Sequence, residues 1–153
     1  YTLFPHLTIA QNAAFAARDR DRVQGLLHMF GLAALQDRKP AAVSGGERQR
    51  CAICQALASE PRLLLLDEPF SALDVFTRRD LRSRLRAMIA ELDLTVVYVT
   101  HDVTEALYLA DNLVPVVEGR IDRHWLQRSI AQIETGGDDR SRSVREPRLA
   151  VVY

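Results

Sequence analysis

The chain has 153 residues, of which 48% are apolar and 26% charged, a composition typical of one globular domain with its own core. Its 20 basic and 20 acidic residues cancel, so the bulk charge gives no support for binding nucleic acid. No apolar run approaches the roughly 20 residues that span a bilayer, and no signal peptide is visible.

The first part of the chain is predicted to be helical. Thr8 can cap a helix over 9–17, and a second helix is expected over 20–30, with Gly31 as its C′ residue. After an irregular stretch, a longer helix is predicted over 45–59, and Pro61 closes it.

Two strands and an intervening helix are predicted next. The four leucines of 63–66 form an apolar run between turn signals, which favours a central strand buried on both faces. Residues 75–92 have an apolar stripe, with arginines off the stripe on a solvated face, and 95–100 is a β-branched strand. A strand–helix–strand order predicts parallel pairing, so both strands should end at the same edge of the sheet.

The last third of the chain is predicted to contain shorter elements. A short helix over 104–110 precedes a strand and tight turn over 112–121. Residues 123–133 fit a helix, 136–148 is a charged linker poor in apolar residues, and the closing "LAVVY" fits the start of another strand.

Cys51 and Cys54 lie three residues apart in the helix predicted over 45–59. This spacing occurs in metal and redox sites, but the chain has no second cysteine pair and no histidine cluster nearby. We therefore interpret them as two small thiols in the core or half-buried, consistent with a reducing cytosol.

Acidic and imidazole side chains follow the two predicted strands. Asp67 and Glu68 come directly after the leucines, and His101 and Asp102 follow the second strand. Carboxylates gathered at one edge repel each other unless a cation lies among them, and Mg²⁺ with substrate phosphates is a common solution. A second carboxylate could orient an attacking water. The alternative is that Asp67 and Glu68 only cap the next turn.

The stretch from Ser44 to Glu47 has the pattern of a capping box at a helix start. Exposed N–H groups and glycines at such a start allow an anion to touch the backbone, which suggests a phosphate cradle, although many such starts are only caps. The phosphate loop G-x-x-x-x-G-K-[ST] is absent, because the only lysine, Lys39, precedes a proline.

Taken together, "VSGGERQR", "LLLLDEP", "SALD" and "VTHD", in this order, resemble the nucleotide-binding subunit of ATP-binding cassette (ABC) transporters over about residues 1–121. The resemblance implies an α/β, P-loop NTPase-like fold, with a parallel sheet flanked by helices and a helical subdomain. It implies a helical and signature subdomain over 1–50, the C-terminal part of the ATPase core over 51–121, and a C-terminal extension over 122–153. The part that carries the Walker A loop is expected to be missing.

The resemblance also implies roles for single residues. Asp67 resembles the Walker B aspartate of the Mg²⁺ site, Glu68 the catalytic carboxylate that polarises water, and His101 the switch histidine that contacts the γ-phosphate. The signature motif and the D-loop imply nucleotide-binding residues that act across a dimer interface: Ser44, Gly45, Gly46, Glu47 and Asp74.

The function implied by the resemblance is an ATPase subunit that powers solute import, with ATP and Mg²⁺ as cofactors. Its expected partners are a second ATPase subunit, transmembrane permease subunits and, indirectly, a solute-binding protein, with no nucleic acid. It would lie at the cytoplasmic face of the inner membrane as a peripheral protein. Two alternatives stay open: a non-transport ATPase of the same superfamily, and an incomplete fragment that is inactive alone.

Overall fold

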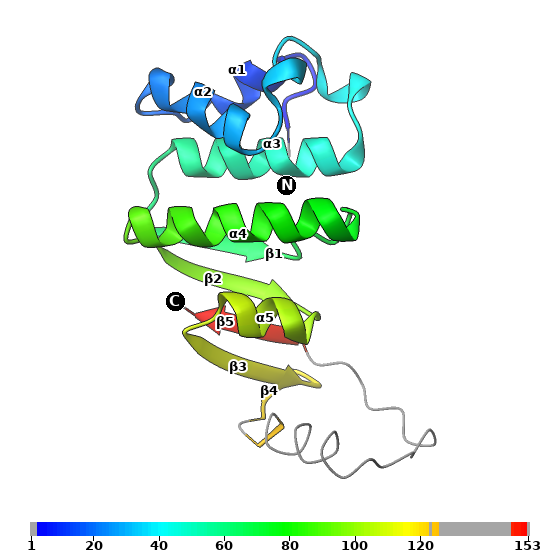
Figure 1. Cartoon of the computed structure of the whole chain (residues 1–153), viewed down its shortest axis with the longest axis vertical. Helices are drawn as coiled ribbons and strands as arrows, with labels where there is room; N and C mark the ends of the chain where they lie inside the picture. Colours follow the sequence, from blue (N-terminus) through cyan, green and yellow to red (C-terminus); the bar gives the residue numbers. More distant parts are fainter. Residues whose placement is uncertain (1–2, 123, 126–147, 153) are drawn as a thin grey trace. The chain divides into compact units, whose positions relative to one another are not determined.

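Helices are the main regular structure of the N-terminal half in this computed structural model, which describes residues 3–122, 124–125 and 148–152 (Figure 1). Contacts along the chain divide it into two units. Residues 1–64 and 69–95 form the helical unit, and residues 65–68 and 96–153 form the sheet unit. The bounds of the helices are α1 Ile9–Ala13, α2 Arg20–Met29, α3 Gly45–Ala58 and α4 Val75–Glu91 in the helical unit, and α5 Val103–Leu109 in the sheet unit.

Within the helical unit, α1 and α2 pack on α3 and on each other (Figure 1). Two 3₁₀ turns, η1 Ala33–Leu35 and η2 Pro40–Ala42, carry the chain from α2 to α3. The helices begin where the sequence places capping residues: Thr8 accepts a hydrogen bond from Gln11 N–H, and Gly31 has φ +66° after α2. Fully buried side chains that fill the space between these helices include Ile9, Leu27, Phe30 and Leu57.

The first helix is shorter than predicted. The sequence favours a helix over 9–17, but α1 ends at Ala13. Beyond this point the backbone turns: Arg18 N–H donates to the carbonyl of Ala58 (3.2 Å), and the Phe15 ring lies 4.3 Å from that of Phe4. Tertiary contacts therefore override the helix propensity of this alanine-rich stretch.

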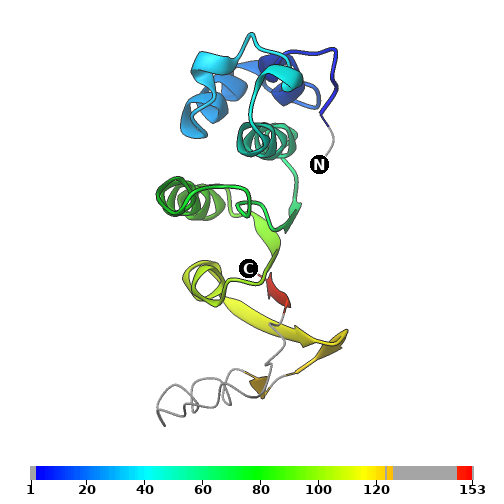
Figure 2. The same cartoon turned by 90° about the vertical axis from the view of Figure 1, so that its right-hand side faces the viewer.

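Among the described residues, five strands form one sheet: β1 Leu63–Asp67, β2 Thr95–Thr100, β3 Asn112–Val117, β4 Arg120–Ile121 and β5 Arg148–Val152. The strand order is β1-β2-β5-β3-β4. The arrows of β1 and β2 point the same way in Figure 1, which confirms the predicted parallel pairing. Because β5 is antiparallel to both β2 and β3, these two also run parallel to each other. Helix α5 lies on one side of β2, β5 and β3 (Figure 2).

The prediction that the leucine strand is buried on both faces is wrong for this structure. Leu64 and Leu66 are buried, whereas Leu63 and Leu65 are 51% and 69% exposed. Alternate side chains of a strand point to opposite faces, so one face of β1 is covered and the other is not covered by the residues that the structure describes. The apolar composition of a strand thus indicated burial that only one of its faces has.

Pro115 occurs in the middle of β3, where it lacks the N–H that a ladder requires. The carbonyl of Pro115 accepts a hydrogen bond from Asp122 N–H (2.9 Å), just beyond the two-residue strand β4. In an extended strand the N–H and C=O of one residue point to the same side. The proline therefore removes one bond next to the edge strand, where its cost is small.

The closing "LAVVY" was predicted to begin a strand, and β5 confirms a strand there. The predicted helix over 123–133 and most of the predicted linker lie outside the described residues. Among the described helices, none combines the length and the apolar composition required to cross a bilayer.

Both cysteines are buried and free, as predicted, and each thiol lies near a backbone carbonyl of another helix. Burial raises the pKa of Cys51 to about 11 and the pKa of Cys54 well above its usual value.

We expect neither thiol to react with a disulfide reagent within minutes at pH 8, and both to react at once in denaturant. Since unfolded thiols ionise near pH 8.5, the free energy of unfolding should fall as pH rises from about 8.5 towards 11. Fast labelling of the native chain would contradict this burial.

Candidate active site

The first component of the site is the end of β1. Glu68 follows the strand with φ +47°, a left-handed conformation that a non-glycine residue adopts at a cost. Its N–H donates to the carbonyl of Val99 (2.9 Å), which fixes this turn to the end of β2. The two parallel strands therefore deliver Glu68 and His101 to the same edge, as the strand–helix–strand pattern predicts.

Glu68 and His101 are in direct contact. Oε1 of Glu68 accepts the backbone N–H of His101 (3.0 Å) and lies 2.5 Å from the ring atom Nδ1. A carboxylate accepts protons from its partners, so this contact favours the tautomer with hydrogen on Nδ1. The His101 side chain is 56% exposed and that of Glu68 is 30% exposed, so the pair is open to a ligand from solvent.

Asp67 is the last residue of β1 and is exposed. In the part of the chain that the structure describes, no group of three or more histidine, cysteine, aspartate or glutamate side chains could hold a metal ion. Asp67 itself offers a single exposed carboxylate, and one or two carboxylates with phosphate oxygens and water are the usual ligands of Mg²⁺.

The second component is the start of α3 in the helical unit, where the predicted capping box is present. Ser44 Oγ accepts from Glu47 N–H (3.3 Å), and the Glu47 carboxylate accepts from Ser44 N–H (2.6 Å). These bonds from Ser44 lower the pKa of Glu47 below its usual value. Arg48 donates to the carbonyls of Pro40 (3.2 Å) and Val43 (2.8 Å), so the approach to the helix is held as well.

The two glycines of this helix start differ in their surroundings. A Cβ at Gly45 would meet only Arg48 Nη2, at 3.9 Å, which is an ordinary van der Waals contact. A Cβ at Gly46 would lie 2.6 Å from Leu73 Cδ2, so glycine permits close packing against the segment before α4. An added Cβ would therefore fit at Gly45 and clash at Gly46, and the nucleotide-binding roles of both glycines stay predictions.

Asp74 caps α4 in the same unit. Its Oδ1 accepts the N–H groups of Phe76 (3.1 Å) and Thr77 (3.0 Å), and hydrogen bonds from Thr77 lower the pKa of this carboxyl group. This explains the local structure of the predicted D-loop. The nucleotide-binding role of Asp74 stays a prediction, as do the roles of the other site residues.

Sequence reasoning missed a buried polar pair behind His101. Thr100 Oγ1 donates to Oε2 of Glu105 (2.7 Å), and these residues are 0% and 4% exposed. The spacing of Asp102 and Glu105 resembles a capping box, in which the glutamate would face solvent. The signal that could have revealed the pair is the threonine at the buried end of β2, five residues before that glutamate.

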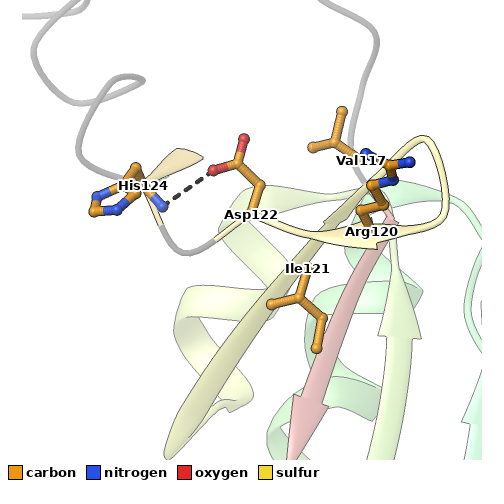
Figure 3. A pocket seen from close by; sticks show the side chains of 5 residues that line it. All are labelled: Val117, Arg120, Ile121, Asp122 and His124. Carbon is orange, nitrogen blue, oxygen red and sulfur yellow. Dashed lines mark hydrogen bonds between the residues drawn. The ribbon is translucent and has the colours of Figure 1, made fainter.

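A shallow hollow elsewhere in the sheet unit contains none of the predicted site residues. Val117, Arg120, Ile121, Asp122 and His124 line it, and His124 N–H donates to Asp122 Oδ1 (3.1 Å; Figure 3). The Glu68–His101 pair lies instead on an open edge, as expected for a site that is closed by another molecule.

Comparison with known proteins gives consistent results. Residues 1–71 match the family described as "ABC transporter". A sulfate/thiosulfate import ATP-binding protein from Gloeobacter violaceus is 48% identical over 131 residues, covering 80% of this chain and 38% of that protein. A molybdate/tungstate import ATP-binding protein from Archaeoglobus fulgidus is 48% identical over 127 residues, covering 79% of this chain and 53% of that protein.

A solved structure shares the fold. It is a dimer of the ATP-binding cassette MJ0796 in a post-hydrolysis state with ADP and Pi, with a TM-score of 0.70 and 32% identity over 80% of this chain and 57% of that one. The chain spans only part of these three proteins: 38% of the Gloeobacter protein, 53% of the Archaeoglobus protein and 57% of the cassette of known structure.

Proposed function

Because the chain belongs to the ATP-binding domains of the ABC transporter family, we propose that it is part of an ATP-hydrolysing subunit that powers solute import. The observation that carries this proposal is the contact between Glu68 and His101 at the edge where β1 and β2 end. Open α/β sheets bind ligands at this edge, and a carboxylate paired with an imidazole can orient and deprotonate water.

In the proposed mechanism, Glu68 accepts a proton from the attacking water while His101 keeps the carboxylate in place. With its proton on Nδ1, the imidazole presents Nε2 as an acceptor to water when neutral and as a donor to phosphate when protonated. Bound Mg²⁺ would supply charge neutralisation at the transferring phosphate. Asp67 would hold this ion through one carboxylate, and Ser44 and Gly45 would bind phosphate oxygens through the helix start.

The residues fit these ligands in two respects. An exposed single carboxylate at Asp67 suits an ion that takes its remaining ligands from phosphates and water. At Gly45 an added Cβ would meet only the end of the Arg48 side chain, at 3.9 Å, and the missing side chain of glycine suits the approach of an anion to backbone N–H groups.

The proposed partners follow from the relatives. The matching cassette structure is described as dimeric, and the two import proteins are named as ATP-binding components of importers. We propose a second copy that lends the start of its α3, permease subunits in the inner membrane, and a peripheral position on the cytoplasmic face of that membrane. The relatives act on sulfate or thiosulfate and on molybdate or tungstate by their names, so an oxyanion is the proposed cargo class.

A segment exchange tests the proposal. In the Archaeoglobus relative, the segment matched over 127 residues is replaced by the corresponding residues of this chain, and we call the product the chimeric cassette. We expect the chimeric cassette to hydrolyse ATP only with Mg²⁺, measured as released phosphate. The 153-residue chain alone should show no binding below about 1 mM ATP in calorimetry, because it contains no G-x-x-x-x-G-K-[ST] loop.

Two outcomes would contradict this assignment. Tight ATP binding by the chain alone would mean that its phosphate grip lies elsewhere in the sequence. A chimeric cassette that folds and binds ATP but releases no phosphate would exclude Glu68 and His101 as hydrolytic residues and favour an inactive fragment.

A further inference from the structure

A buried carboxyl group lies next to the Glu68–His101 pair without taking part in it. Glu105, in the first turn of α5, is 4% exposed. A buried carboxyl group is costly unless hydrogen bonds replace its water. Within residues 3–122, 124–125 and 148–152, Oε1 of Glu105 has no hydrogen-bond partner. The bond from Thr100 to Oε2 is therefore the one side-chain interaction that the described residues offer this group.

Thr100, Asp102 and Glu105 form a closed set of hydrogen bonds. Thr100 Oγ1 donates to Glu105 Oε2 (2.7 Å) and accepts Asp102 N–H (3.1 Å), and Asp102 Oδ1 accepts Glu105 N–H (3.0 Å). Thr100 is the last residue of β2, and Glu105 belongs to the first turn of α5. These bonds fix the turn between the strand and the helix.

His101 is the residue enclosed by this set. Its own side chain is 56% exposed, and both neighbours along the chain, Thr100 and Asp102, are held by the bonds of the Thr100 hydroxyl. The N–H of His101 must point at Glu68 Oε1 for the 3.0 Å bond between them to form. The orientation of the site pair therefore depends on the buried pair behind it.

We propose that Glu105 and Thr100 are positioning residues, which hold His101 in hydrogen-bonding reach of Glu68 through the closed set of bonds around it. The expected effect on the rate of ATP hydrolysis rests on the proposed function, because positioning of His101 matters for rate only if His101 and Glu68 act on water. The expected effect on the position of His101 rests only on the contacts described.

The structural consequence is measured on the 153-residue chain by amide hydrogen exchange. Thr100→Val removes the hydroxyl and keeps the shape of the side chain, so we expect the His101 amide to exchange at least about tenfold faster. Thr100→Ser keeps the hydroxyl and should restore the original rate. Thr95→Val, the same change at an exposed position of β2, is the control and should leave the His101 amide unaffected. Unchanged exchange in folded Thr100→Val would overturn the proposal.

The kinetic consequence is measured in the chimeric cassette. Thr100→Val should lower kcat roughly 10- to 100-fold, with the KM for ATP within about twofold, because misplacement of a catalytic group affects the transition state more than binding. In a His101→Ala background the same change should have no further effect, since the buried pair acts through that residue. An equal loss with and without His101 would indicate a merely structural role and reject the proposal.

A second variant, at Glu105, and the exchange rate of the His101 amide still test the proposal if Thr100→Val does not fold or the cassette is inactive. If Thr100→Val fails to fold, as judged by circular dichroism, Glu105→Met keeps the length of the side chain but has no oxygen to accept the Thr100 bond, and must show the same changes in exchange and kcat. If the chimeric cassette with an unaltered Thr100 is inactive, the proposed function fails, and the exchange rate of the His101 amide still decides whether Thr100 and Glu105 position this residue.

Discussion

Replacing Glu68 by glutamine in the chimeric cassette is expected to lower ATP hydrolysis by about 10²–10³-fold while ATP binding changes by less than about threefold. Glutamine has nearly the same shape and retains an acceptor for His101 N–H, but it cannot take a proton from water. The loss should therefore appear in kcat and leave the KM almost unchanged. Phosphate release under saturating Mg-ATP measures the first quantity, and calorimetry measures binding.

Glu60→Gln is the matched control for this substitution. Glu60 also has a positive φ, of 51°, and it forms an exposed ion pair with Arg22. The control should retain full hydrolysis, because an exposed pair contributes little and Glu60 belongs to no predicted site. If Glu68→Gln keeps more than about a tenth of the rate, a general-base role for Glu68 is untenable.

Replacing Gly45 by aspartate should be nearly as damaging, for an electrostatic reason. The new side chain would fit beside the helix start, because an added Cβ meets only Arg48 Nη2 at 3.9 Å, and its carboxylate would repel the phosphate that we place there. An acidic side chain in the first turn of a helix is favourable, so the substitution should not unfold α3. We expect a loss of roughly 10²-fold or more in hydrolysis with an unchanged thermal unfolding midpoint.

Mixing the Gly45→Asp and Glu68→Gln variants of the chimeric cassette tests whether Gly45 acts on the nucleotide of the partner subunit. In a mixed dimer, the Gly45→Asp chain retains Glu68, and the Glu68→Gln chain lends it an intact helix start. One of two sites in such a dimer is then complete, so random pairing should recover up to about a quarter of the unaltered rate. If mixing recovers no activity although mixed dimers form, each helix start serves its own chain and the proposed arrangement is wrong.

Much of the fold follows from local signals that the sequence displays. Four helices begin at a residue whose side chain accepts a backbone N–H of the first turn, as N-caps require: Thr8, Asp19, Ser44 and Asp74. The juxtaposition of Glu68 and His101 was also predictable, because it depends only on two parallel strands ending at one edge.

What the sequence did not reveal depends on tertiary context. The composition of β1 does not distinguish one covered face from two, and the contact of Phe15 with Phe4 ends α1 early. The burial of Glu105 was missed for a similar reason: a glutamate three residues after an aspartate is usually a solvated cap, and only the position of Thr100 makes it a core residue.

The place of β5 in the sheet has a consequence for how the chain acquires its structure during synthesis. Residues 148–152 lie between β2 and β3, so these two strands lack their shared neighbour until those residues leave the ribosome. About 30 residues separate β3 from β5, which at 5–20 residues per second means roughly 1.5–6 s of waiting. During this interval the nascent polypeptide exposes unpaired strand edges, which makes it a substrate for chaperones and proteases.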